Sequence, residues 1–158
     1  MNFLTEHGIS NYGELESKLT ALSTRRDTAH AEIKRIESRS AELALVMKHA
    51  GTYRQLKPLY DRYRKSNDKE KFLRGHESEI ILFEAAAREL KRLGAVPLPT
   101  TESMKTELAN LSAEKERLLA EYKTARTEAQ EYETVKQNVD TLLAVPKEQE
   151  QQRRHELE

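Results

Sequence analysis

Several residue types are rare or missing in this sequence, and each absence excludes something. The chain has no cysteine and no tryptophan, and only 5 glycines and 4 prolines among its 158 residues. Without cysteine there is no disulfide, no thiol nucleophile and no cysteine-ligated metal, which fits a reducing compartment. No apolar run approaches the roughly 18 residues that a membrane-spanning helix needs, and no secretory signal is recognisable. We therefore expect a cytoplasmic chain without membrane insertion.

Charge of neither sign dominates the composition. The 27 Lys and Arg residues balance 27 Asp and Glu residues, and only 37% of the chain is hydrophobic. This apolar fraction is low for a large globular core and favours one elongated domain with much surface per residue. Between the few glycines and prolines, the chain is rich in Ala, Glu, Lys, Leu and Arg, which are strong helix formers. Because no β-branched run alternates with polar residues, we expect an all-α fold.

The first long helix is predicted to begin at Asn11, since Asn11 and Glu14 have the spacing of a capping box. Apolar residues then recur with alternating spacings of four and three, which is typical of a coiled-coil seam. The seam positions are Leu15, Leu19, Leu22, Arg26, Ala29, Ile33, Ile36, Ser40, Leu43, Met47 and Ala50. Only Arg26 and Ser40 are polar among them.

A second seam of the same spacing follows Pro99, with Thr100 as the predicted N-cap. Its positions are Met104, Leu108, Leu111, Lys115, Leu118, Tyr122, Ala125, Ala129, Tyr132, Lys136, Val139 and Leu143. Pro146 is predicted to end this helix, because proline cannot continue the hydrogen-bond ladder. The polar residues Arg26, Lys115 and Lys136 either fix the register of the seams or mark a place where a partner helix docks, and the first reading is favoured.

Two seams of nearly equal length predict each other as partners. We expect a long antiparallel helical hairpin, coiled-coil-like, with a small helical head. An N-terminal segment 1–10 precedes the first helix 11–50, the head covers 51–99, the second helix covers 100–145, and a disordered polar tail covers 146–158. The alternative is an up-down-up three-helix bundle, which would leave half of the first seam unpartnered and would require a homodimer.

The head is predicted to consist of two helical pieces. The first helix should bend or break near Gly51, because the aromatic face that follows is out of phase with the seam. Pro58 favours the same break, since proline lacks the backbone N–H that a helix uses as a hydrogen-bond donor. The second piece, about 68–93, is predicted to be capped by Asn67 and to stop at Gly94. The residues expected to be buried in this piece are Phe72, Ile80, Phe83, Ala87 and Leu90.

No motif in the sequence predicts catalysis. The five histidines are not spaced as metal ligands on a helix, and there is no Gly-rich phosphate loop and no nucleophile elbow. We therefore predict no catalytic, cofactor-binding or metal-binding residues, and expect a chain that is not itself an enzyme and needs no cofactor.

One segment stands out by its charge. Between Lys48 and Arg74, nine basic residues face only three acids, although the whole chain is neutral. The nine are candidates for nucleic-acid binding: Lys48, Arg54, Lys57, Arg62, Arg64, Lys65, Lys69, Lys71 and Arg74. Interleaved aromatic residues suit a surface that grips phosphates and stacks bases. They equally suit a small core with solvated cations outside, and the helical spacing of the tyrosines favours that second interpretation.

Four stretches, in order, resemble the C-terminal helical region of relaxase/mobilisation nuclease proteins from conjugative and mobilisable elements of Gram-positive bacteria. They are Asn2–Ile9, Tyr53–Lys65, Ala113–Tyr122 and Val135–Leu143. The resemblance implies a parent protein that nicks DNA at a transfer origin, with a tyrosine nucleophile and a histidine-bound metal ion in its N-terminal domain. No residue of that catalytic half can be matched here.

The resemblance and the missing chemistry together predict a non-catalytic C-terminal domain of a conjugative-transfer relaxase. Its first expected role is protein–protein contact, in the relaxosome or with proteins of the transfer machinery, through the long helical faces. The alternative is an accessory DNA-binding domain whose basic head grips transfer-origin or single-stranded DNA.

Overall fold

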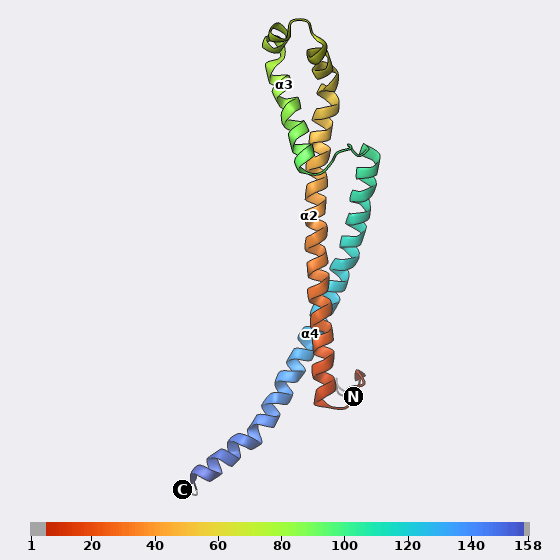
Figure 1. Cartoon of the computed structure of the whole chain (residues 1–158). Coiled ribbons are helices and arrows are strands. Elements are labelled where there is room, and N and C mark those ends of the chain that lie inside the picture. Colours follow the sequence, from red (N-terminus) through yellow and green to blue (C-terminus); the bar gives the residue numbers. More distant parts are fainter. Residues whose placement is uncertain (1–5, 157–158) are drawn as a thin grey trace. The chain divides into compact units, whose positions relative to one another are not determined.

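The computed structural model describes residues 6–156, with the side chains of residues 6–143 (Figure 1). This part of the chain is all-helical, as predicted, and consists of α2 (Tyr12–Lys65), α3 (Lys69–Arg92) and α4 (Thr101–Glu156). Residues 1–5 of the predicted N-terminal segment and 157–158 of the predicted tail lie outside the described residues. None of the helices, searched over the described residues, combines the length and apolar character that a bilayer crossing requires.

The chain divides into two compact units, which we treat separately. Unit 1 comprises the residues up to Ile33 and those from Glu116 onward, and unit 2 comprises Lys34–Lys115. Each unit therefore contains part of α2 and part of α4, and α3 belongs to unit 2.

In unit 1 the two long helices run antiparallel. Tyr12, at the start of α2, donates from its hydroxyl to Oδ1 of Asp140, late in α4, at 2.6 Å. Further along α2, Arg25 pairs with Glu121 at 3.7 Å. The seam between these points is closed by a core cluster of Leu15, Leu22, Ala129 and Tyr132. The predicted hairpin seam is thus confirmed in this unit.

In unit 2 the remainder of α2 contacts both α3 and the start of α4. Arg39 donates from Nε to Oε1 of Glu107 at 2.8 Å and from Nη2 to Oε2 of the same carboxylate at 3.3 Å. Lys115 pairs with Glu37 at 3.5 Å, so this polar seam residue joins the two helices, as a register-setting role requires. The buried core of the unit includes Ile36, Leu43, Val46, Ala50, Ile80, Phe83, Ala86, Leu90 and Met104.

The helix ends follow the capping rules with one correction. Asn11 Oδ1 accepts from the Glu14 amide at 2.9 Å, and Thr100 Oγ1 accepts from the Ser103 amide at 3.1 Å, so both predicted N-caps are confirmed. The α3 N-cap is Asp68, and the prediction of Asn67 is wrong, because Asp68 Oδ1 accepts from the Lys71 amide at 3.1 Å.

The C-terminal end of α3 lies where the sequence places it. Gly94 adopts φ +72°, a conformation that glycine enters without a steric penalty. The Ala95 amide donates to the Leu90 carbonyl, and the Gly94 amide donates to the Lys91 carbonyl, which is the hydrogen-bond pattern of a Schellman motif.

Two predicted helix boundaries are wrong. There is no break at Gly51, because α2 continues through Pro58 to Lys65. A proline removes one backbone donor, and α2 remains packed on α3 at this point, with Leu59 only 9% exposed. Similarly, α4 continues past Pro146 to Glu156 in place of the predicted disordered tail. The residues after Pro146 are mostly Lys, Glu, Gln and Arg, which favour helix strongly enough to extend it.

Two details of the predicted core differ in the structure, and α3 carries a backbone kink. Phe72 and Ala87 are only partly buried, whereas Ala86 is buried. The backbone of α3 leaves helical geometry at His76, with φ −136° and ψ 25°, directly after Gly75. In α4, the last predicted seam residue, Leu143, is 59% exposed.

We predict a pH-dependent contribution from Tyr12. Its hydrogen bond to Asp140 raises the pKa of the phenol from its ordinary value of 10 to about 12. Because the folded chain holds this proton more tightly than the unfolded chain, the stabilisation is complete below pH 10 and is lost between pH 10 and about 12. Melting temperatures of the native chain and Tyr12→Phe should therefore differ at pH 9 and converge by pH 12. A difference that does not change with pH would contradict this assignment.

Candidate nucleic-acid interface

Six of the nine basic candidates gather where α2 ends and α3 begins. We call this group the basic tip: Arg62, Arg64, Lys65, Lys69, Lys71 and Arg74. All six are exposed. The other three, Lys48, Arg54 and Lys57, lie earlier on α2 and do not belong to the tip.

The turn that carries the basic tip is short and internally hydrogen-bonded. Only residues 66–68 separate the two helices. Ser66 donates from its amide to the Tyr63 carbonyl at 3.2 Å and from its hydroxyl to the Asp68 carbonyl at 3.2 Å. The Phe72 amide also donates to the Asp68 carbonyl, at 3.1 Å. These bonds hold the end of α2 next to the start of α3, so the two helix ends that carry the six cations are joined by an ordered turn.

The acids near the basic tip leave its positive charge largely uncompensated. Residues 62–74 contain only two, Asp68 and Glu70, and the Asp68 carboxylate caps the Lys71 amide. The nearby Asp61 is bound by Lys57 at 3.1 Å. Among the described residues, no carboxylate forms an ion pair with a side chain of the basic tip. None of the six cations therefore has an ion-pair partner among the described residues, although Arg74 donates from Nε to the Glu70 carbonyl at 3.4 Å.

The position of two tip residues is unfavourable for the helix that carries them. Lys69 and Lys71 stand in the first turn of α3, at the positive end of its dipole. A cation there costs about 0.3–1 kcal/mol relative to a neutral residue, whereas cations such as Arg64 and Lys65 at the end of α2 are favourable. Helix stability thus explains the basic residues of α2 but not those of α3, and a negatively charged ligand would explain both.

Two of the remaining candidates are engaged within the chain. Arg54 donates to the Pro99 carbonyl at 2.6 Å and to Thr101 Oγ1 at 2.7 Å, and so fastens α2 to the start of α4. Lys57 is paired with Asp61. Arg54 and Lys57 are close to the basic tip in sequence, and so they were among the candidates. In the structure their side chains bind groups within unit 2.

The aromatic residues of the head form one continuous ring cluster. Phe83, 5% exposed, lies between Tyr53 and Tyr60, with ring centroids 4.8 and 4.3 Å away and stacked. Tyr63 follows Tyr60 at 5.8 Å, and the cluster continues through Phe72 to His76. The interpretation of these aromatics as a small core is therefore supported by their mutual packing.

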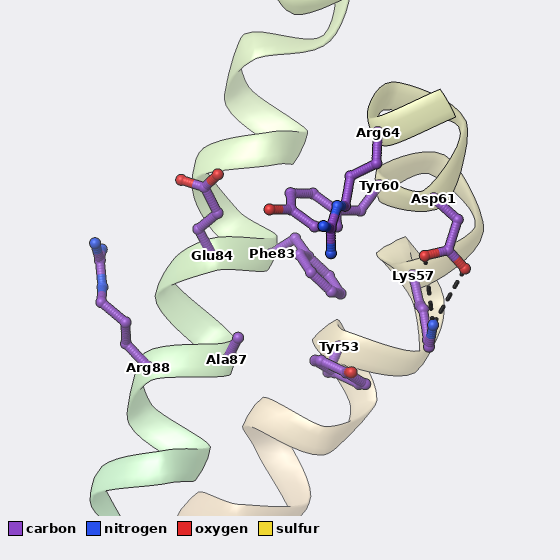
Figure 2. A pocket seen from close by; sticks show the side chains of 9 residues that line it. All are labelled: Tyr53, Lys57, Tyr60, Asp61, Arg64, Phe83, Glu84, Ala87 and Arg88. Carbon is purple, nitrogen blue, oxygen red and sulfur yellow. Dashed lines mark hydrogen bonds and ion pairs between the residues drawn. The ribbon is translucent and has the colours of Figure 1, made fainter. Parts of the chain in front are cut away.

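A cavity of about 450 Å³ opens beside this cluster (Figure 2). In this view the Arg64 side chain extends toward Tyr60 and Phe83, and Asp61, Glu84 and Arg88 lie further out. Arg88 is not among the sequence candidates because it lies outside the basic segment, and only the return of α3 along α2 makes it line the same cavity as Arg64. Three cations, Lys57 among them, and two acids line the cavity, so it is less positive than the basic tip.

The described residues contain no group of three or more His, Asp or Glu side chains arranged to hold a metal ion. Comparison of the whole chain with protein-family models, with curated proteins and with solved structures finds no match. A function for this chain is therefore inferred from the geometry described above and from the sequence resemblance.

Proposed function

We propose that this chain is a non-catalytic helical module that binds DNA through the basic tip. The observation that carries the proposal is the set of six exposed cations on the two helix ends that flank one short turn, none of them in an ion pair within the described residues. Phosphate contacts from Lys and Arg supply most of the affinity of non-specific DNA binding. The two lysines in the first turn of α3 add weight, because they oppose the helix dipole and gain from a bound anion.

The setting we propose is the C-terminal part of a conjugative-transfer relaxase. It is supported by the four resembling stretches, of which Tyr53–Lys65 includes the α2 half of the basic tip. A DNA-holding module beside a nicking domain would keep the transfer-origin region attached to the protein.

The test is a fluorescence-anisotropy titration of the chain with a labelled duplex of about 30 base pairs, in about 50 and 200 mM salt. The triple variant Arg64→Ala/Lys65→Ala/Lys69→Ala should lower the affinity about 10²-fold at the lower salt concentration. The slope of log K against log salt should also become shallower by about 0.9 for each phosphate that the variant no longer binds.

Two controls separate the tip from general charge and from folding. The variant Lys18→Ala/Lys123→Ala/Arg126→Ala removes three exposed cations of unit 1 and changes the net charge equally. It should change the affinity less than about three-fold. Arg54→Ala should reduce stability by about 1 kcal/mol, because it removes two hydrogen bonds, without a comparable decrease in binding. Equal decreases in the two triple variants would refute the basic tip as the DNA-binding surface.

Protein contact within the relaxosome is the second candidate function, and one observation favours it. Ile81 and Leu82 on α3 are 54% and 56% exposed and adjacent, and Ala85, one turn further, is only partly covered. Neighbouring exposed apolar side chains are typical of contact surfaces. If Ile81→Asp/Leu82→Asp abolishes co-purification with a transfer-machinery protein while DNA binding persists, this second role stands beside the first.

A further inference from the structure

The proposed function does not specify whether the basic tip binds duplex or single-stranded DNA. The packing of the aromatic cluster favours one of the two. We propose that the tip binds the phosphate backbone of duplex DNA and does not hold the bases of a single strand. This inference rests on the proposed DNA-binding function and specifies its substrate class.

Single-strand binding without sequence preference needs exposed aromatic faces on which bases can stack. In this head Phe83 is buried and stacks on Tyr53 and Tyr60, which are themselves only partly exposed. Phe83 is covered on two sides by Tyr53 and Tyr60, with interplanar angles of 25° in both pairs. Opening either pair to admit a base would forfeit the stacking between its rings, so these faces are poor platforms for a single strand.

The rings nearest the basic tip are also engaged. Tyr63, in the last turn of α2, lies 6.0 Å from Phe72 on α3 and 5.8 Å from Tyr60. Phe72 in turn lies 4.7 Å from His76. These contacts join the two helices at the tip, so the rings of this part of the chain act as its core. The cations are the more exposed groups of the tip, since all six are exposed and Tyr63 and Phe72 are partly buried.

A surface of cations alone favours the nucleic acid with the higher charge density. A duplex presents one negative charge per roughly 1.7 Å of its axis, about twice the density of one strand. The counterion release per phosphate contact is correspondingly larger for duplex DNA, with slopes of about −0.9 against −0.7 per contact. Cations at the end of α2 and at the start of α3 flank the same ordered turn and can engage several phosphates together.

The experiment compares the binding of the full chain to the same duplex and to each of its separated strands, at about 50 mM salt and over a salt series. We expect the duplex to bind about ten-fold more tightly than either strand, and with the steeper salt slope. Equal or tighter binding of the single strands overturns the inference while leaving DNA binding by the tip intact. Absence of binding to duplex and strands alike overturns the proposed function as well.

Tyr63 provides a second test, because it lies within the basic segment at the end of α2 and is only partly buried. Tyr63→Leu and Tyr63→Phe should both retain duplex affinity within about two-fold, since neither removes a cation. Circular dichroism of each variant checks that the helices persist. If Tyr63→Leu weakens binding as much as the tip triple variant does while Tyr63→Phe retains it, a base stacks on this ring and the inference is wrong.

Discussion

Phe83→Ala is expected to lower the free energy of unfolding of unit 2 by about 3–5 kcal/mol. Phe83 is 5% exposed and, among the described rings, is the one that stacks with both Tyr53 and Tyr60. Its removal leaves a cavity between α2 and α3 and deprives both tyrosines of their partner. Urea denaturation followed by circular dichroism measures the change.

The matched control for Phe83→Ala is Leu82→Ala, at the preceding residue. Leu82 is on the same helix but 56% exposed, so Leu82→Ala removes apolar surface that already meets solvent. Its effect should stay within about 0.5 kcal/mol, as for other surface substitutions. If the two variants are equally stable, Phe83 is not the centre of the head's core, and the rings would then be available to a ligand.

Tyr132→Ala is expected to destabilise unit 1 by a similar amount, about 3–5 kcal/mol. Tyr132 is 1% exposed and is the largest fully buried side chain of the described residues. It packs in the seam with Leu15, Leu22 and Ala129, where the small Ala129 leaves room for the ring. Burial, together with the nearby carboxylates of Glu128 and Glu131, also raises the pKa of its phenol.

The control for Tyr132→Ala is again a substitution at the neighbouring residue, Glu133→Ala. Glu133 is exposed, and Glu133→Ala should change the free energy of unfolding by no more than about 0.5 kcal/mol. Thermal melts of both variants, with circular dichroism as the signal, give the two values. A small effect of Tyr132→Ala would mean that the antiparallel seam of unit 1 does not depend on its largest residue.

The helical character and the seams could be predicted from the sequence because both depend on local order along the chain. Strong helix formers and a four-three spacing identify a buried face without reference to any partner. Every position of the first seam is buried or partly buried, including the polar Arg26 and Ser40. The caps at Asn11 and Thr100 were equally predictable, since a cap involves residues only three apart.

The candidate site was predicted only in part. The basic segment is visible in the sequence, but the positions of its nine basic residues do not reveal which of them are exposed at one place on the folded chain. Arg54 reaches Pro99 and Thr101, which lie far along the chain beyond α3, and no local pattern foretells that contact. The helix boundaries at Gly51 and Pro146 failed for a related reason, because packing and neighbouring propensity outweigh a single unfavourable residue.

The sequence by itself determined that this chain is helical, that two seams bury its apolar residues, and that its neutrality conceals a basic segment. These properties follow from residue type and spacing. Only the tertiary structure decided that six cations flank one short turn, that Arg54 and Lys57 are engaged elsewhere, and that Tyr53 and Tyr60 stack on Phe83. The physical reason is that side chains on α2, α3 and α4 meet only after the chain has folded back on itself.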